Sequence, residues 1–235
     1  MPAVTHLVVG AGQVGTAVHQ VLSRAHDAAI RDVAPVDATA DVLHICFPWS
    51  GRFVADVRAY RLAHAADLVV VHSTVPVGTC DPHGWVHSPV RGRHPHLAEG
   101  LLTFAKHFGG GRAAEAAKPF EAAGCDVAVH PRAADTEAAK LFELCSYGFA
   151  IAFEKAVHAY CAERGLDFDA VYTAFRESYN DGYIALGHPK FVQPVLRHVP
   201  GPIGGHCIVP SMALLDHPFA EQVVAASEAA EAELG

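Results

Sequence analysis

The chain has 235 residues and a net charge of −8, and it is 51% hydrophobic and 18% charged. This composition is ordinary for a globular protein of one large domain or two modest ones, and the acidic balance excludes a general nucleic-acid binder. No apolar run is long enough to span a bilayer and no signal-peptide pattern is present, so we expect a cytoplasmic protein with no membrane or nucleic-acid partner.

The first half alternates short β-branched runs with amphipathic stretches, a pattern typical of a parallel sheet covered on both faces by helices. The predicted strands are 4–9, 28–33, 42–47, 68–72, 85–90, 103–108 and 126–130. The predicted helices are 13–25, 51–65 and 112–123.

The pattern changes near residue 133. Residues 135–164 contain no strong breaker except Gly148 and predict one long helix that ends at Gly165. Helices are also predicted at 167–185 and 219–234, joined by a proline-rich connection. We therefore predict an α/β fold in which a Rossmann-type doubly wound parallel sheet (1–133) is followed by an all-helical domain with a long central helix (134–235).

The sequence Gly10-Ala11-Gly12-Gln13-Val14-Gly15 matches the dinucleotide motif G-x-G-x-x-G between a predicted strand and a predicted helix. Its glycines would allow a tight turn, close approach to a pyrophosphate and close helix–strand packing. Asp32 ends the second strand, where a carboxylate would hold ribose hydroxyls and repel a 2′-phosphate, which favours NAD over NADP. The same turn could bind S-adenosylmethionine, and this alternative stays open.

None of the six cysteines are spaced as C-x-x-C, and no histidine pair has metal-ligand spacing, so we expect no metal. Most of the cysteines are expected to be buried. Cys207 differs because it lies among glycines and prolines in GPIGGHCIVP, where a thiolate could attack a carbonyl carbon. His206 beside it could lower the pKa of the thiol or contact substrate.

Five stretches make the chain resemble the UDP-glucose/UDP-N-acetylmannosamine/GDP-mannose dehydrogenase family. They are GAGQVG, HICFP, HSTVPVGT, TEAAKLFE and GPIGGHCIVP. The resemblance implies NAD-dependent oxidation of a sugar alcohol, with the aldehyde captured by a cysteine. The chain ends about where the third domain of that family would begin.

Carried over to this sequence, Cys207 matches the family nucleophile, Lys140 the lysine that supports a developing oxyanion, and Thr74 the threonine near the nicotinamide and a catalytic water. The predicted cofactor-binding residues are Gly10, Gly12, Gln13, Val14, Gly15, Asp32, Phe47, Pro48, Ser73 and Thr74. This chain has Val90 where the family has glutamate and Leu144 where it has asparagine, which places thioester hydrolysis in question.

Further residues are predicted to contact substrate. Tyr147, two turns after Lys140, could partly replace the absent asparagine. The polar and aromatic stretch before the cysteine loop adds Tyr179, Asn180, Tyr183 and Lys190. The long helix forms the dimer core in the resembled family and carries an apolar stripe here, so a homodimer is expected.

The sequence therefore predicts an NAD-dependent oxidoreductase acting on an alcohol or aldehyde of a sugar-like substrate or nucleotide-sugar. Two alternatives remain: a S-adenosylmethionine-dependent transferase on the same scaffold, and a non-catalytic nucleotide-binding subunit.

Overall fold

A computed structural model describes residues 3–32, 38–205 and 207–232 of the chain. The chain divides into two compact units, Met1–Lys140 and Leu141–Gly235, which are described separately. The division falls inside helix α5 (Ala133–Arg164), so the first turns of this helix belong to the first unit.

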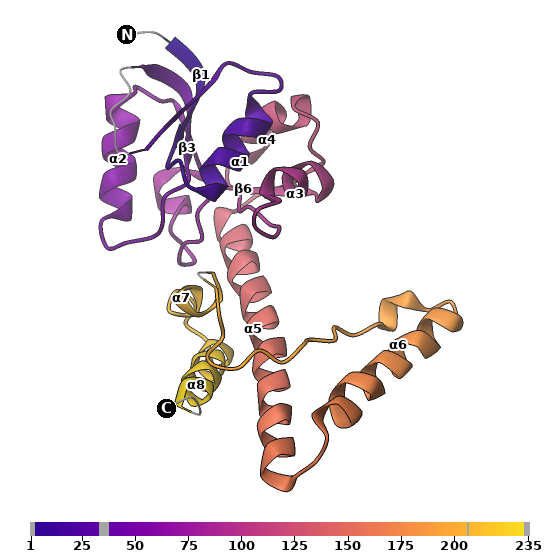
Figure 1. The fold of residues 1–235 in the computed structure, drawn as a ribbon. Coiled ribbons are helices and arrows are strands. Elements are labelled where there is room, and N and C mark those ends of the chain that lie inside the picture. The colour runs from indigo at the N-terminus through magenta and orange to yellow at the C-terminus, as the bar shows by residue number, and fades with distance from the viewer. Residues whose placement is uncertain (1–2, 33–37, 206, 233–235) are drawn as a thin grey trace. The chain divides into compact units, whose positions relative to one another are not determined.

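The first unit is built on a seven-stranded sheet with the order β2-β1-β3-β4-β5-β6-β7 (Figure 1). Strands β1 to β5 are parallel to one another. Strand β6 is antiparallel to β5, and β7 is parallel to β6. The strands are β1 (Ala3–Val9), β2 (Ala28–Arg31), β3 (Thr39–Ile45), β4 (Leu68–Val71), β5 (Val86–His87), β6 (Lys106–Gly109) and β7 (Val127–His130).

Helices cover both faces of this sheet. One core packs the strands against α1 (Gln13–Leu22), α3 (Leu97–Thr103) and α4 (Ala113–Ala122). The other packs them against α2 (Phe53–Ala63), whose Phe53 and Val57 are fully buried. A short 3-10 helix, Asp81–His83, precedes β5. The layered α/β fold expected from the alternating pattern is confirmed.

Two details of the predicted sheet are wrong. The sheet is not parallel throughout, because the connection from β5 to β6 holds only the short helix α3 and returns the chain in the opposite direction. Helix α3 (residues 97–103) was not predicted. It forms because Leu97 and Leu101 lie one helical turn apart and are both buried in the core. The strand expected at 103–108 consequently begins at Lys106.

The second unit is helical. After α5 come a π-helical turn (Asp169–Thr173), α6 (Ala174–Ala185), a 3-10 turn (Pro189–Phe191), α7 (Ile208–Met212) and α8 (Pro218–Ala232). A core around Leu141, Cys145 and Ile208 joins α5, α7 and α8. Gly148 permits this packing, because a Cβ there would lie 2.8 Å from Val223 and 2.9 Å from Ile208. The described helices include none that is both long and apolar enough to cross a membrane.

Candidate functional site

The glycine-rich turn after β1 has the geometry that its motif predicts. Gly10 has a φ of +102°, which favours glycine, and a Cβ there would lie 3.0 Å from the backbone of Cys46. A Cβ on Gly15 would lie 1.7 Å from the carbonyl oxygen of Gly10, so helix α1 can begin against the strand only with glycine there. Gly12, the N-cap of α1, has open space where its Cβ would be. Gln13 and Val14 form the first turn of α1, whose backbone N–H groups are available to an anion.

A cavity of about 600 Å³ adjoins this turn. The structure brings Gly10, Asp32 and Phe47 to the same cavity, as predicted for a cofactor site, and the carboxylate of Asp32 is exposed. The residues that line it are Val9, Gly10, Asp32, Phe47, Arg52, Asp56, Ala59 and Tyr60. A glycine edge facing a carboxylate fits the pyrophosphate and ribose of a dinucleotide.

Arginines also lie at or near this cavity. The guanidinium of Arg31 lies 4.9 Å from the ring centre of Tyr60, and Arg52 pairs with Asp56 at 3.5 Å. Arg52 and Tyr60 line the cavity together with Asp32, whereas Arg31 is not among the lining residues.

The loops that follow β3 and β4 are tied together. The hydroxyl of Ser73 donates to the carbonyl oxygen of Phe47 at 2.6 Å, and Ser73 is 9% exposed. Thr74 is half-buried beside it, and Pro48 is exposed. These residues lie at the carboxyl ends of parallel strands, which is the edge at which ligands bind in open α/β sheets.

Glu137, which the sequence analysis did not single out, fixes the turn after β4. Its fully buried carboxylate accepts hydrogen bonds from the backbone N–H groups of Gly78 at 2.6 Å and Cys80 at 2.8 Å. Gly78 lies within the STVPVGT stretch, and Cys80 follows it directly. A buried carboxylate held by two backbone donors is a strong structural contact, and its signal in the sequence was a glutamate three residues before Lys140.

His87 also supports the turn that contains Ser73. Its Nε2–H donates to the carbonyl oxygen of Ser73 at 3.2 Å, and its Nδ1 lies 2.9 Å from the hydroxyl oxygen of Thr136. Burial lowers the pKa of His87 to about 3, so the ring is neutral. His87 therefore serves as a fixed structural link between β5, the Ser73 turn and α5.

Lys140 is half-buried and donates from Nζ to the carbonyl oxygen of Val90 at 3.0 Å. Val90 stands where the resembled family has glutamate, and its side chain is 6% exposed. This contact with Val90 holds the lysine near the end of β5.

In the second unit, Cys207 is exposed at the start of α7. Cys80, Cys125, Cys145 and Cys161 are buried, as expected, and Cys46 is half-buried. Burial raises the pKa of Cys46 to about 12 and raises those of Cys80, Cys125 and Cys145. Cys207 is therefore the thiol best placed to meet a substrate.

The other predicted substrate contacts differ in their surroundings. Tyr147 is 54% exposed, and the rings of Tyr179 and Tyr183 lie 4.8 Å apart. Lys190 is exposed and lies over the ring of Phe191. His206 lies outside the described residues.

Asn180 is held by the protein itself. Its amide donates to the carbonyl oxygen of Gln193 at 2.8 Å and accepts from the N–H of Gln193 at 2.9 Å. These two bonds account for the buried side chain without a ligand.

A row of buried histidines crosses the sheet, and the sequence analysis did not anticipate it. His6, His44 and His72 lie on or just after β1, β3 and β4, and each stands two residues beyond the partner of the one before. His6 Nδ1 lies 3.0 Å from His44 Nε2, His44 Nδ1 lies 3.0 Å from His72 Nε2, and His72 Nδ1 lies 2.7 Å from the carbonyl oxygen of Ser88. Because that oxygen can only accept, His72 carries a proton on Nδ1. Burial lowers the pKa values of all three histidines, and with neutral rings His44 and His6 also carry their protons on Nδ1. His6 Nε2 has no hydrogen-bond partner in the part of the chain described.

Lys106 ends this histidine row. Its Nζ donates to the same carbonyl oxygen of Ser88 at 3.1 Å, and it is 3% exposed. Burial lowers its pKa to about 7 and lowers that of His6 to about 4. Residues 3–32, 38–205 and 207–232 contain no group of three or more side chains suited to hold a metal ion.

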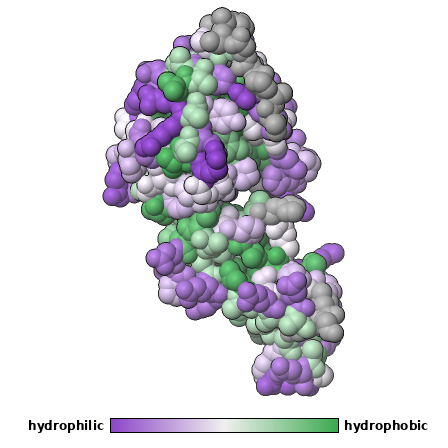
Figure 2. Space-filling model, turned by 90° about the vertical axis from the view of Figure 1, so that its left-hand side faces the viewer, coloured by the Kyte–Doolittle hydropathy of each residue, from purple (hydrophilic) through white to green (hydrophobic). Residues whose placement is uncertain are grey.

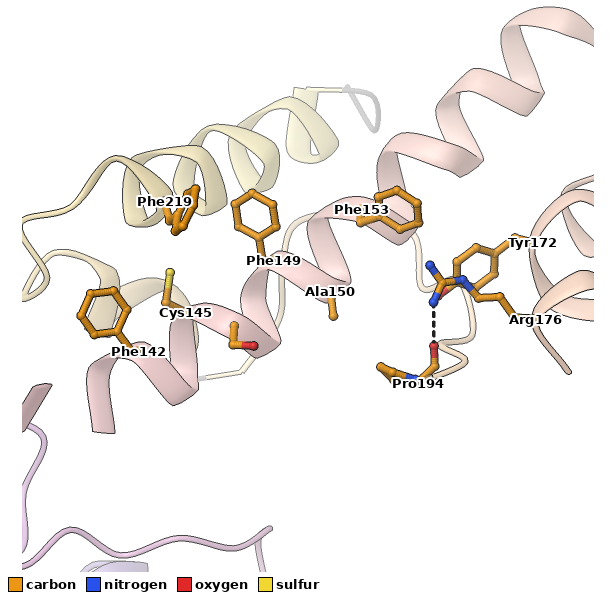
Figure 3. A pocket seen from close by; sticks show the side chains of 10 residues that line it. Phe142, Cys145, Phe149, Ala150, Phe153, Tyr172, Arg176, Pro194 and Phe219 are labelled. Carbon is orange, nitrogen blue, oxygen red and sulfur yellow. Dashed lines mark hydrogen bonds between the residues drawn. The ribbon is translucent and has the colours of Figure 1, made fainter. Parts of the chain in front are cut away.

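The second unit also exposes apolar surface (Figure 2). A cavity of about 600 Å³ runs along α5, where Phe149 faces Phe219 with ring centres 5.4 Å apart (Figure 3). Arg176 closes one end and donates to the carbonyl oxygen of Pro194 at 3.3 Å. Three of the phenylalanines of this groove are substantially exposed, Phe142 at 43%, Phe153 at 50% and Phe219 at 51%, whereas Tyr172 is buried.

No family profile and no curated protein sequence matches this chain. Solved structures do match it. A UDP-D-ManNAc dehydrogenase from Pyrococcus horikoshii aligns with a TM-score of 0.75 at 16% identity, over 97% of this chain and 69% of that one. A UDP-N-acetyl-mannosamine dehydrogenase from Staphylococcus aureus aligns with a TM-score of 0.71 at 17% identity, over 98% of this chain and 69% of that one.

A second kind of neighbour matches end to end. A 3-hydroxyisobutyrate dehydrogenase from Salmonella typhimurium aligns with a TM-score of 0.60 at 18% identity, over 98% of this chain and 96% of that one. At these identities the matches establish the fold. The resemblance to nucleotide-sugar dehydrogenases is thereby confirmed at the level of the fold, and the transferase alternative is not favoured.

Proposed function

We propose that this chain is an NAD-dependent oxidoreductase of the nucleotide-sugar dehydrogenase type, acting on the alcohol or aldehyde carbon of a sugar-like substrate. One observation carries the proposal. The glycine turn and Asp32 share a cavity, in a fold that matches UDP-sugar dehydrogenases over nearly the whole chain.

The residues that would hold NAD are those of the glycine turn with Asp32, Phe47, Pro48, Ser73 and Thr74. When bound, NAD supplies a hydride acceptor. The open space at Gly12 and the free N–H groups of α1 suit a pyrophosphate, and Asp32 suits ribose hydroxyls.

The chemical roles follow from the side chains. Oxidation of the alcohol would transfer a hydride to the bound NAD and the hydroxyl proton to solvent water, leaving an aldehyde. Cys207 adds its sulfur to the aldehyde carbon, and the thiol proton passes to the carbonyl oxygen. Lys140 stabilises negative charge on that oxygen, and Thr74 holds water near the reacting carbon. Tyr147, Tyr179, Tyr183, Lys190 and His206 are proposed substrate contacts. Asn180 was predicted with them, but its two bonds to Gln193 favour a structural role.

The test is NADH formation by the purified chain with UDP-glucose and UDP-N-acetylmannosamine, together with calorimetric binding of NAD, NADP and S-adenosylmethionine. We expect NAD to bind in preference to the other two and NADH to form with at least one sugar nucleotide. If the thiol adduct passes a hydride to a second NAD and its hydroxyl proton to solvent water, a thioester forms, and water would cleave it to release the acid and the free thiol. Cys207→Ser should therefore abolish acid formation. Binding of S-adenosylmethionine alone would refute the proposal.

A second candidate is oxidation of a small 3-hydroxy acid. It is favoured by the match to 96% of the 3-hydroxyisobutyrate dehydrogenase chain. Turnover of 3-hydroxyisobutyrate that survives Cys207→Ser would select this candidate, since its chemistry needs one hydride transfer and no thiol adduct.

We also propose that the second unit pairs with another copy of the chain through the groove on α5. The exposed aromatic side chains there would leave water on pairing, and the long helix is the dimer core that the family resemblance implies. Light scattering should show a dimer that Phe153→Asp converts to a monomer. Leu62→Asp, at an 84% exposed position on α2, is the matched control and should stay dimeric.

A further inference from the structure

The chain that leads to Cys207 is fastened to α5 by two consecutive side chains. Lys155 donates from Nζ to the carbonyl oxygens of Val199, at 2.8 Å, and Gly201, at 2.5 Å. Glu154 accepts at 2.8 Å from Nδ1 of His198. Lysine and glutamate are rarely buried, yet these two are 9% and 2% exposed, so their partners must compensate the loss of water.

The contacts of His198 extend this anchor. Its ring stacks on His158 with ring centres 3.5 Å apart, and the edge of Phe168 meets both rings. Since His158 lies one helical turn after Glu154, the two side chains of α5 hold His198 on the same face of the helix.

A third contact fastens the chain just after Gly201. The backbone N–H of Ile203 donates to the hydroxyl of Ser227 on α8 at 3.0 Å, and the Ile203 side chain is buried. Beyond the cysteine, Ile208 is buried in the same core. Gly204, Gly205 and Cys207 are exposed between these fixed points. The exposed Cys207 is therefore followed directly by a buried residue, and Ile203, four residues before it, is bonded to α8.

We infer that Glu154 and Lys155 are positioning residues that fix the residue 198–201 segment and, through it, the thiol of Cys207. The inference rests on the proposed nucleophilic role of Cys207. It assigns a role to two buried charged side chains in the apolar stripe of α5, and it accounts for the two hydrogen bonds from the lysine to backbone carbonyl oxygens of the segment before the cysteine.

The test compares Lys155→Met, Lys155→Arg and Glu154→Gln with Lys118→Met and Glu163→Gln, which change exposed side chains on α4 and α5. Amide hydrogen exchange of peptides covering 199–205 should accelerate about fivefold or more in Lys155→Met, while peptides from β1 and β3 exchange as in the wild type. The two control variants should match the wild type throughout.

The kinetic readout separates positioning from general damage. Per folded, NAD-binding enzyme, Lys155→Met should lower kcat about 10-fold or more with KM for NAD within about twofold, because a displaced nucleophile slows the chemical step. Lys155→Arg, which keeps a cation able to donate to both carbonyls, should recover most of kcat. Glu154→Gln should show a smaller loss in the same direction.

The outcomes are distinct. Unchanged exchange at 199–205 in Lys155→Met overturns the inference, as does faster exchange with unchanged kcat. If the wild type forms no NADH with any substrate, the proposed function fails by itself, and the exchange result alone decides whether Lys155 holds the segment.

Discussion

Both units pair their buried polar side chains internally, but they differ in how many aromatic side chains they expose. The first unit buries polar side chains and pairs nearly all of them internally, as in the histidine row and at Glu137. The second unit leaves aromatic side chains in water, with Tyr160 51% and Phe175 75% exposed. Exposed aromatic rings are therefore concentrated in the second unit, which is the unit that we propose to pair with another copy of the chain.

This comparison can be tested one unit at a time. Both tryptophans, Trp49 and Trp85, lie in the first unit, so tryptophan fluorescence reports unfolding of that unit alone. Hydrogen exchange mapped to peptides reports the second.

The largest effect is expected at Gly15. In Gly15→Ala the new methyl group would overlap the carbonyl oxygen of Gly10, and helix α1 must shift from the strand. We expect a loss of about 3 kcal/mol or more in unfolding free energy, a fall of about 6–12 °C in Tm, and no measurable NAD binding.

Gly12→Ala is the matched control, because open space surrounds that position. It should leave the tryptophan-detected Tm within about 2 °C. A comparable Tm loss in both variants would contradict the packing argument.

Glu137→Gln is expected to have the next largest effect. The amide keeps one acceptor but turns N–H groups toward a backbone N–H, so one of the two donors in the turn after β4 loses its partner. The expected cost is about 2 kcal/mol, seen in urea unfolding followed by tryptophan fluorescence. Glu121→Gln, on the exposed face of α4, should leave the midpoint unchanged, and equal effects of the two would refute a special role for Glu137.

Much of the first unit could be predicted from the sequence. The glycine turn, Asp32 and the order of strands follow from local signals, namely a motif of fixed spacing and apolar runs of strand length. The contact of Glu137 with Gly78 could not, because the two are 59 residues apart and meet only through the packing of α5. The histidine row could not be predicted either, because it depends on how β1, β3 and β4 pair in register, and these strands lie far apart in the sequence. For Lys155, the sequence shows only a charged residue within the apolar stripe of the predicted long helix, and this does not indicate its backbone partners.

The pH dependence of stability should expose Lys106. Its pKa is lowered to about 7 from 10.5, so between these values the unfolded chain binds a proton that the native chain does not, and stability rises with pH. One such proton contributes a slope of about 1.4 kcal/mol per pH unit. His6, with its pKa lowered from 6.5 to about 4, acts in the same sense at acidic pH, where stability is lost as the pH falls from 6.5 toward 4.

Urea unfolding of the first unit at several pH values from 5 to 9.5 measures this slope. Lys106→Met should remove the rise in unfolding free energy above pH 7. The loss of stability between pH 6.5 and 5 should remain. The exposed Lys118→Met should follow the wild type. A wild-type profile that is level between pH 7 and 9 would show that Lys106 keeps its proton in the folded protein.

The smallest effect is expected in the second unit, at Asn180. Its amide links α6 to the backbone of Gln193, so Asn180→Ala should cost about 1 kcal/mol and speed hydrogen exchange in peptides covering 190–196. Tryptophan fluorescence should record the wild-type midpoint, because the first unit is intact. Asp181→Ala, at the exposed neighbouring position, should change neither readout. Since a structural contact and a substrate contact differ in kinetics, an Asn180→Ala enzyme whose KM for a sugar nucleotide rises about 10-fold, with exchange at 190–196 unchanged, would return Asn180 to the substrate site.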